Sequence, residues 1–290
     1  QLGLPNDYVA TYRDKVAAIT EADVRRAAQA HIHPDRAVVV VVGDATQILD
    51  KVEKFGSVRL LDADGKPLAR SDLEVKASDV ALDGSGIQPA TRVYNVMFQG
   101  NAVASATATI TREQIEGVDA VRVVMEMGGM GTLKQELAFE AATFRPLFSK
   151  FEQQLGPATA SIDLRVEGGK VVGKVALPGA EPRDVSLDAV QGLLLPGMDE
   201  YAIMVADLEP GASFTLPVVN AQSGTLANLQ IKVVGESKVT VAAGEFEVYE
   251  LEATGAEGSM KLYVTKAAPH ILVKQEPAGQ PVTIELKEMR

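Results

Sequence analysis

The 290-residue sequence contains no cysteine and no tryptophan, and aromatic residues make up only 5% of it. Without cysteine the chain cannot form disulfides, use a thiolate nucleophile or bind a metal through sulfur. Positive charge is also in deficit, because 28 Lys and Arg face 39 Asp and Glu and the formal net charge is −11. Phosphate binding needs clustered basic residues, so we expect the chain to bind neither nucleic acid nor an anionic membrane surface. No apolar run approaches the roughly 20 residues of a membrane-spanning helix, so we expect no transmembrane segment.

The remaining composition is that of a globular protein, with 46% hydrophobic and 23% charged residues. The length suffices for one large domain or two ordinary ones. The sequence pattern changes before residue 91, where a polar stretch contains Pro89 and two glycines. We therefore predict a helix-rich segment over 1–68, a linker over 69–90 and an antiparallel β domain over 91–290.

Three helices are predicted in the first segment. Apolar residues spaced by three and four from Tyr8 to Ile19 indicate an amphipathic helix. Thr20 and Asp23 form a variant of the capping box and begin a second helix, which Pro34 stops. A third helix is predicted over 45–56, where Gly56 closes it.

The five consecutive valines Val38–Val42 suit a strand that is buried on both faces. Such a strand needs partner strands, and the helices before it supply none. A second short strand is predicted over 57–67, with a turn at Asp64-Gly65.

From Thr91 onward, short alternating segments are separated by turn residues. Gly168-Gly169 is a good hairpin turn, and "GGMGTLKQEL" reads as another turn because the spacing of a phosphate-binding loop is absent. A helix is predicted over Leu187–Leu195. We expect ten or more antiparallel strands, enough for the sheet to curl.

No constellation of catalytic residues stands out. His31 and His33 have a spacing that can serve a metal, but they straddle a helix end and Pro34, so an interaction of His31 with the helix C-terminus is the better interpretation. Ser-His-Asp signatures are absent, and carboxylates are too numerous for a pair to be singled out. We therefore predict no catalytic residue and no metal ligand in this chain.

Residues 1–68 resemble the end of an insulinase/pitrilysin-type zinc metallopeptidase. The motifs that carry this resemblance are Leu4-Pro5-x-Asp7-Tyr8, "VAAITEADVRRAA" and "HPDRAVVVVVGD". The resemblance implies that the helices and the valine strand close an α/β lobe whose other strands lie upstream, in a precursor or a partner chain. The parent protein would then be a hydrolase. Its His-x-x-Glu-His zinc motif is absent here, so zinc would belong only to the upstream lobe and this chain would hold no cofactor.

Residues 90–287 are similar to a bacterial envelope β domain family of unknown function. The matching positions are Val241, Gly244, Phe246, Tyr249, Tyr263, Pro269, Val273 and Lys274. This resemblance implies a curved antiparallel sheet and a location in the bacterial periplasm or cell envelope.

The predicted fold class is thus α+β, with a small helix–strand–helix remnant of a metallopeptidase α/β lobe followed by a large curved antiparallel β-sheet, half-barrel-like, domain. We expect the β domain to bind a partner, a peptide or an apolar ligand on its concave face, in a cavity of at least ~300 Å³. The candidate lining residues are Met125, Met127, Phe139, Phe144, Leu193, Leu194, Met198 and Met204. Ordinary core packing is the alternative interpretation for most of them. A structural or assembly module without ligand, including a homo-oligomer, is the alternative, and an independent hydrolase is a third.

Overall fold

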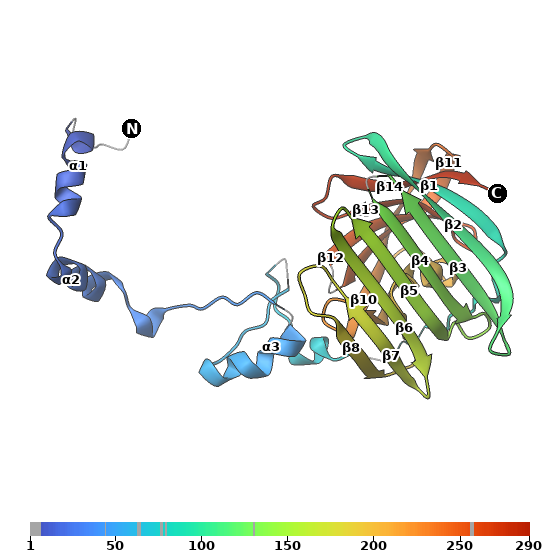
Figure 1. The fold of residues 1–290 in the computed structure, drawn as a ribbon, viewed down its shortest axis with the longest axis horizontal. Helices are drawn as coiled ribbons and strands as arrows, with labels where there is room; N and C mark the ends of the chain where they lie inside the picture. The colour runs from blue at the N-terminus through green and yellow to red at the C-terminus, as the bar shows by residue number, and fades with distance from the viewer. Residues whose placement is uncertain are drawn as a thin grey trace. The chain divides into compact units, whose positions relative to one another are not determined.

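A computed structural model describes residues 7–43, 45–62, 65–75, 78, 80–129, 131–255 and 258–290. The chain divides into two compact units, Gln1–Val58 and Arg59–Arg290 (Figure 1). The first unit is helical, and the second contains the whole β-sheet.

The helices of the first unit follow the sequence closely. They are α1 (Tyr8–Ala17), α2 (Glu21–His31) and α3 (Ala45–Val52), with 3₁₀ turns at Pro34–Arg36 and Glu53–Phe55. The predicted capping box is confirmed: the Asp23 amide donates to Thr20 Oγ1 at 3.3 Å, and the Thr20 amide donates to Asp23 Oδ2 at 3.0 Å. Each bond satisfies a backbone donor that the helix start would otherwise leave without an acceptor.

The prediction of a buried valine strand is wrong. Residues Val38–Val42 lie outside any helix or strand, and their side chains are 52–94% exposed. A strand needs a neighbour to bond its backbone groups, and the described residues of the first unit form no other strand. The short strand predicted over 57–67 is reduced to a single bridge between Leu61 and Pro67. Its predicted turn lies partly outside the described residues.

The second unit is built on one antiparallel sheet of 14 strands, in the order β8-β7-β6-β5-β4-β3-β2-β1-β14-β13-β12-β11-β10-β9. The expectation of ten or more antiparallel strands is confirmed. The first half of the sheet comprises β1 (Ala90–Phe98), β2 (Asn101–Ile115), β3 (Val118–Gly128), β4 (Thr132–Glu140), β5 (Pro146–Leu155), β6 (Ala158–Glu167), β7 (Lys170–Ala176) and β8 (Arg183–Asp188). The second half comprises β9 (Ser213–Asn220), β10 (Thr225–Val241), β11 (Gly244–Gly255), β12 (Gly258–Thr265), β13 (Leu272–Pro277) and β14 (Val282–Met289).

Tight turns set the register of this sheet where the sequence indicated them. Gly168 and Gly169 have φ of 55° and 77° and join β6 to β7, with Glu167 opposite Lys170. Positive φ at both central residues matches the twist of antiparallel strands, and glycine adopts it without strain. The "GGMG" stretch likewise joins β3 to β4, as predicted, although Met130 lies outside the described residues.

The sheet is curled so that its two halves face each other. In Figure 1 the green and yellow strands β2–β8 lie in front of the orange and red strands of the second half. The core confirms this arrangement, because buried side chains from both halves belong to one apolar cluster. The two ends of the sheet also meet, since the Arg183 guanidinium at the start of β8 donates to the carbonyl oxygens of Ala221 and Gln222, which follow β9.

The chain fills the inside of the curled sheet with its own residues 193–208, which we call the inner segment. It contains the helix α4 (Asp199–Val205) and lies between β8 and β9 in the sequence. Its buried apolar residues are Leu193, Leu194, Leu195, Met198, Tyr201, Ala202, Ile203, Met204, Ala206 and Leu208. Burying a large apolar side chain contributes about 1.5–3 kcal/mol, so this segment supplies a large part of the core.

Polar bonds fix the inner segment to both halves of the sheet. Ser149 Oγ on β5 and Gln135 Nε2 on β4 donate to the Pro196 carbonyl oxygen at 2.8 and 3.2 Å. The Leu194 amide donates to the Pro217 oxygen at 2.8 Å, and the Val219 amide donates to the Leu194 oxygen at 3.1 Å. Residue 194 thereby forms a parallel bridge with β9 and covers part of that edge strand.

The helix predicted over Leu187–Leu195 is wrong, because β8 ends at Asp188 and the helix begins only at Asp199. Gly192 has φ of 73°, which is a left-handed conformation that breaks a right-handed helix. Pro196 disfavours a helical conformation in the residue before it. The apolar run before these residues is therefore core coil, and the helix starts after them.

Strands β6 and β7 approach each other closely at Gly173. It lies in β7 opposite Leu164, with φ of 149°, and a Cβ there would be 1.9 Å from the Asp163 carbonyl oxygen. We expect Gly173→Ala to lower the free energy of unfolding by about 3 kcal/mol or more, because backbone must move. Urea denaturation measures the change. In the control Gly235→Ala, the nearest atom is Glu250 Oε2 at 3.9 Å, so the change should stay within about 1 kcal/mol; equal effects would contradict the close approach.

Candidate functional site

The eight residues predicted to line a concave ligand site lie mainly in packed core. Six of them are almost fully buried: Phe139, Phe144, Leu193, Leu194, Met198 and Met204. The rings of Phe139 and Phe144 stack with centroids 4.1 Å apart, and Tyr201 of the inner segment lies 6.3 Å from Phe139. Met125 and Met127 are partly buried against the same core. Four of the eight belong to the inner segment itself, so they fill the space that a ligand would need. Their role as ligand contacts stays a prediction.

A void of about 20 Å³ lies beside α4. Its lining residues are Asp199, Glu200, Ile203, Leu262, Val264, Leu272 and Gln275. A space of this size holds about one water molecule. It is too small for the apolar ligand that the sequence suggested.

Two adjacent carboxyl groups face this void from the start of α4. The pKa of Glu200 is raised from 4.5 to about 7; burial is the main cause and the charge of Asp199 adds to it, while Arg92 and the hydrogen bond from Tyr94 oppose the rise. The Tyr94 hydroxyl donates to Glu200 Oε1 at 3.3 Å. Burial also raises the pKa of Asp199. At neutral pH, Glu200 can therefore release or accept a proton inside the domain.

Other polar groups lie near these carboxyls in the core. The Arg92 guanidinium on β1 is buried and donates to Met204 Sδ at 3.1 Å. The Tyr201 hydroxyl is buried, and the described residues offer it no hydrogen-bond partner. Buried polar groups of this kind reduce the stability that the apolar contacts supply. Sequence reasoning did not single out Asp199 and Glu200; the available signal was two acids inside the otherwise apolar stretch "LLLPGMDEYAIMV".

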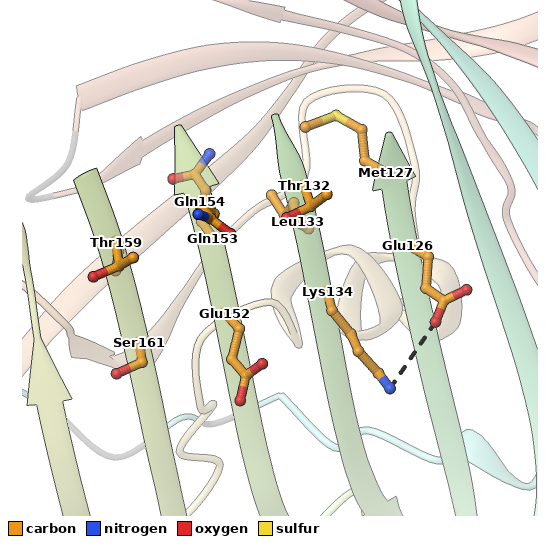
Figure 2. Close-up of a pocket in the computed structure, with 11 residues that line it drawn as sticks. Glu126, Met127, Thr132, Leu133, Lys134, Glu152, Gln153, Gln154, Thr159 and Ser161 are labelled. Carbon is orange, nitrogen blue, oxygen red and sulfur yellow. Dashed lines mark ion pairs between the residues drawn. The ribbon is translucent and has the colours of Figure 1, made fainter. Parts of the chain in front are cut away.

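A larger cavity, of about 490 Å³, lies on strands β3–β6 (Figure 2). It is lined by Glu126, Met127, Thr132, Leu133, Lys134, Glu152, Gln153, Gln154, Thr159, Ala160 and Ser161. Eight of these 11 side chains are polar. Their hydroxyl, amide, ammonium and carboxylate groups can both donate and accept hydrogen bonds.

Strand register explains why polar groups gather at this cavity. Side chains alternate between the faces of a strand. The residues Glu126, Lys134, Glu152 and Ser161 stand opposite one another across β3–β6, and all four are exposed. A second exposed row on the same face contains Thr132, Gln154 and Thr159. Between these rows, Met127, Leu133, Gln153 and Ala160 have the opposite parity and are partly buried. Seven of the eight polar side chains thus lie on the outer face of the sheet, and Gln153 has the opposite parity.

The sequence also raised the question of a metal site at His31 and His33. His31 is the last residue of α2, as predicted, and His33 precedes a 3₁₀ turn. Within the described ranges, no group of three or more His, Cys, Asp or Glu side chains could hold a metal ion. In the same part of the chain, no helix is long and apolar enough to cross a membrane.

The fold and its cavities define a curled antiparallel β domain whose interior is filled by its own chain. A family model described as a protein of unknown function, DUF3108, matches residues 93–287. The chain belongs to the DUF3108 family. This supports the predicted β-sheet domain of unknown function.

Two solved structures are similar to this chain at low sequence identity. One is a β-barrel-like protein of the DUF1849 family from Brucella abortus, with 10% identity, a TM-score of 0.40, and coverage of 69% of this chain and 96% of the other. The second, from Bacteroides fragilis, is described as a candidate exported protein with a YmcC-like fold; identity is 10%, the TM-score is 0.27, and coverage is 73% and 99%. Both TM-scores are low, so neither structure bears on the function of this chain. No curated protein matches.

The assignment of residues 1–68 to an insulinase/pitrilysin-type peptidase is corrected by these comparisons. The family found is DUF3108, and no peptidase family matches. The motifs behind the assignment were Leu4-Pro5-x-Asp7-Tyr8, "VAAITEADVRRAA" and "HPDRAVVVVVGD". Each of these motifs is short, and together they did not identify the family of the chain. The predicted domain boundaries and the periplasmic or envelope location stay predictions.

The raised pKa of the partly buried Glu200 carboxyl makes stability depend on pH. Its folded-state pKa of about 7 exceeds the ordinary value of 4.5, so the folded chain keeps a proton that the unfolded chain releases between these values. This contribution to stability is complete below about pH 4.5 and is lost as the pH rises to about 7. The Glu200→Gln variant has no carboxyl at this position, so its stability does not fall over this pH range for this reason. We therefore expect the free energy of unfolding of the variant, minus that of the unmodified protein, to rise by about 2–3 kcal/mol between pH 4.5 and 7.5.

Urea denaturation at about pH 5 and about pH 8 measures this difference. Glu252→Gln on β11 is the matched control, because Glu252 is exposed; its difference from the unmodified protein should not change with pH. A Glu200→Gln variant that follows the unmodified protein at both pH values would contradict the raised pKa of this carboxyl.

Proposed function

We propose that the DUF3108 domain is a binding module that holds a polar ligand, or the polar side chains of a partner protein, in the outer cavity on β3–β6. The observation that carries the proposal is the cavity itself. Its volume of about 490 Å³ falls within the roughly 300–1,000 Å³ of ligand sites. Its lining offers hydrogen-bonding groups from four neighbouring strands.

The filled interior supports the outer face as the site. The inner segment occupies the concave side of the sheet, and the void beside α4 measures about 20 Å³. An apolar ligand inside the sheet would have to displace residues such as Met198 and Tyr201, which are 0% and 1% exposed. The outer cavity needs no such rearrangement, because its polar side chains already reach solvent.

A structural module without ligand is the second candidate. It is favoured by the continuous 14-stranded sheet and by the bonds that hold the inner segment to β4, β5 and β9. These features suit a rigid spacer whose surfaces position other parts of an assembly. The two candidates differ in whether the outer cavity takes up small molecules.

A fragment screen distinguishes them. Amide resonances of the isotope-labelled 290-residue chain are recorded with a library of small amines, amides, sugars and carboxylates. We expect the shifts to concentrate on the strands around the cavity, and Ser161→Trp to abolish them because an indole would fill the space. Ser186→Trp on β8 is the matched control, since Ser186 is an exposed strand serine outside the cavity lining. Shifts scattered over the surface, or shifts that persist in Ser161→Trp, would contradict the binding proposal.

A further inference from the structure

We infer that the ligand of the outer cavity carries a positively charged ammonium or guanidinium group, and that the Glu152 carboxylate binds this group. The inference rests on the proposed binding function and names its ligand class. It follows from how charges are distributed across the rows of the sheet.

The row of side chains that crosses the cavity contains one more acidic than basic residue. Glu126, Lys134 and Glu152 stand opposite one another on β3, β4 and β5. Lys134 Nζ lies 4.0 Å from Glu126 Oε1, the pair that Figure 2 marks with a dashed line. Across the described residues, Glu152 has no ion pair within 4.0 Å. Lys134 therefore stands between two carboxylates and is paired with Glu126, which leaves Glu152 without an ion pair among the described residues.

The neighbouring rows do not compensate this charge. The next row toward the middle of the strands contains Glu136, Lys150, Asp163 and Lys174, two acids and two bases. The row on the other side contains Thr132, Gln154 and Thr159, which are uncharged. The cavity thus keeps a net negative charge, in a chain whose formal charge is −11.

Lys150 is the basic residue nearest to Glu152 along β5, but its ammonium group is engaged elsewhere. Lys150 Nζ lies 5.8 Å from the centre of the Phe148 ring. Phe148 precedes Lys150 on the strand, whereas Glu152 follows it, so this contact draws the ammonium group away from Glu152. An ammonium group over an aromatic ring gains about 0.5–1 kcal/mol at an exposed site.

The remaining lining groups suit a cation that donates hydrogen bonds. Ammonium and guanidinium groups are donors only, with no acceptor. The Glu152 carboxylate would accept the charged bond, while Ser161 Oγ, Thr159 Oγ1 and the Gln154 carbonyl oxygen can accept further ones. No aromatic side chain is among the lining residues, so recognition rests on charge and hydrogen bonds. An anion is disfavoured, because Lys134 stands between two acids.

The test compares charged and neutral probes of the same shape. Acetyl-Gly-Arg-Gly-amide is titrated into the labelled chain at low salt, beside its citrulline counterpart, which keeps the shape of the side chain without the charge. Spermidine serves as a free amine without a peptide backbone. We expect the arginine probe to shift the cavity resonances and to bind at least about 10-fold more tightly than the citrulline probe, a difference of about 1.4 kcal/mol.

Two charge variants should act in opposite directions. Glu152→Gln removes the acceptor charge and should weaken binding of the arginine probe about 10-fold. Lys134→Gln removes a competing cation and should strengthen it several-fold. Glu252→Gln on β11, an exposed glutamate outside the cavity, should leave it unchanged. A structural role for these residues would not give effects of opposite sign.

The outcomes separate the ligand class from the binding function. If neutral or anionic fragments occupy the cavity and the charge variants change nothing, the cationic ligand is wrong and the binding module stands. If no fragment or probe occupies the cavity, both proposals fail. Tight binding of the arginine probe with weak binding of spermidine would identify a peptide as the source of the cation, and the reverse would identify a free polyamine.

Discussion

The packing of the inner segment against the inside of the curled sheet is the interaction on which the second unit depends. Tyr201 of this segment lies against Phe139 of β4, and Phe139 stacks on Phe144. The same segment bridges to β9 through Leu194 and accepts hydrogen bonds from β4 and β5 at Pro196. A curled sheet of 14 strands would otherwise enclose an empty apolar space, which is costly because its lining loses contacts.

The filled interior determines where ionisable groups and cavities lie in the second unit. Asp199 and Glu200 enter the domain with the inner segment, and burial raises the pKa of both carboxyl groups; for Glu200 the pKa of about 7 makes the stability of the domain sensitive to pH near neutrality. The larger cavity lies instead on β3–β6, where alternation along the strands collects polar side chains around it. The proposed cation site is thus a consequence of strand register, while the pH sensitivity is a consequence of burial.

Local features of the fold were predictable from the sequence, and long-range ones were not. The capping box at Thr20, the Gly168-Gly169 hairpin and the many-stranded antiparallel sheet follow from residues close together in the chain. Val38–Val42 were misread because a strand depends on partners that periodicity cannot show. The apolar run before Pro196 was placed in a helix because run length alone does not separate helix from core coil. The outer cavity depends on register between four strands, so Glu126, Lys134 and Glu152 could not be brought together from the sequence.

Hydrogen exchange of the inner segment tests the central claim most directly. Peptides covering residues 193–208 are compared by mass spectrometry with peptides from β4, β11 and the exposed helices α1 and α2. If this segment is an integral part of the core, its amides should exchange as slowly as those of β4 and β11, through unfolding of the whole domain. Exchange as fast as that of α1 and α2, with the strands still protected, would show that the segment leaves the sheet easily and would contradict a permanently filled interior.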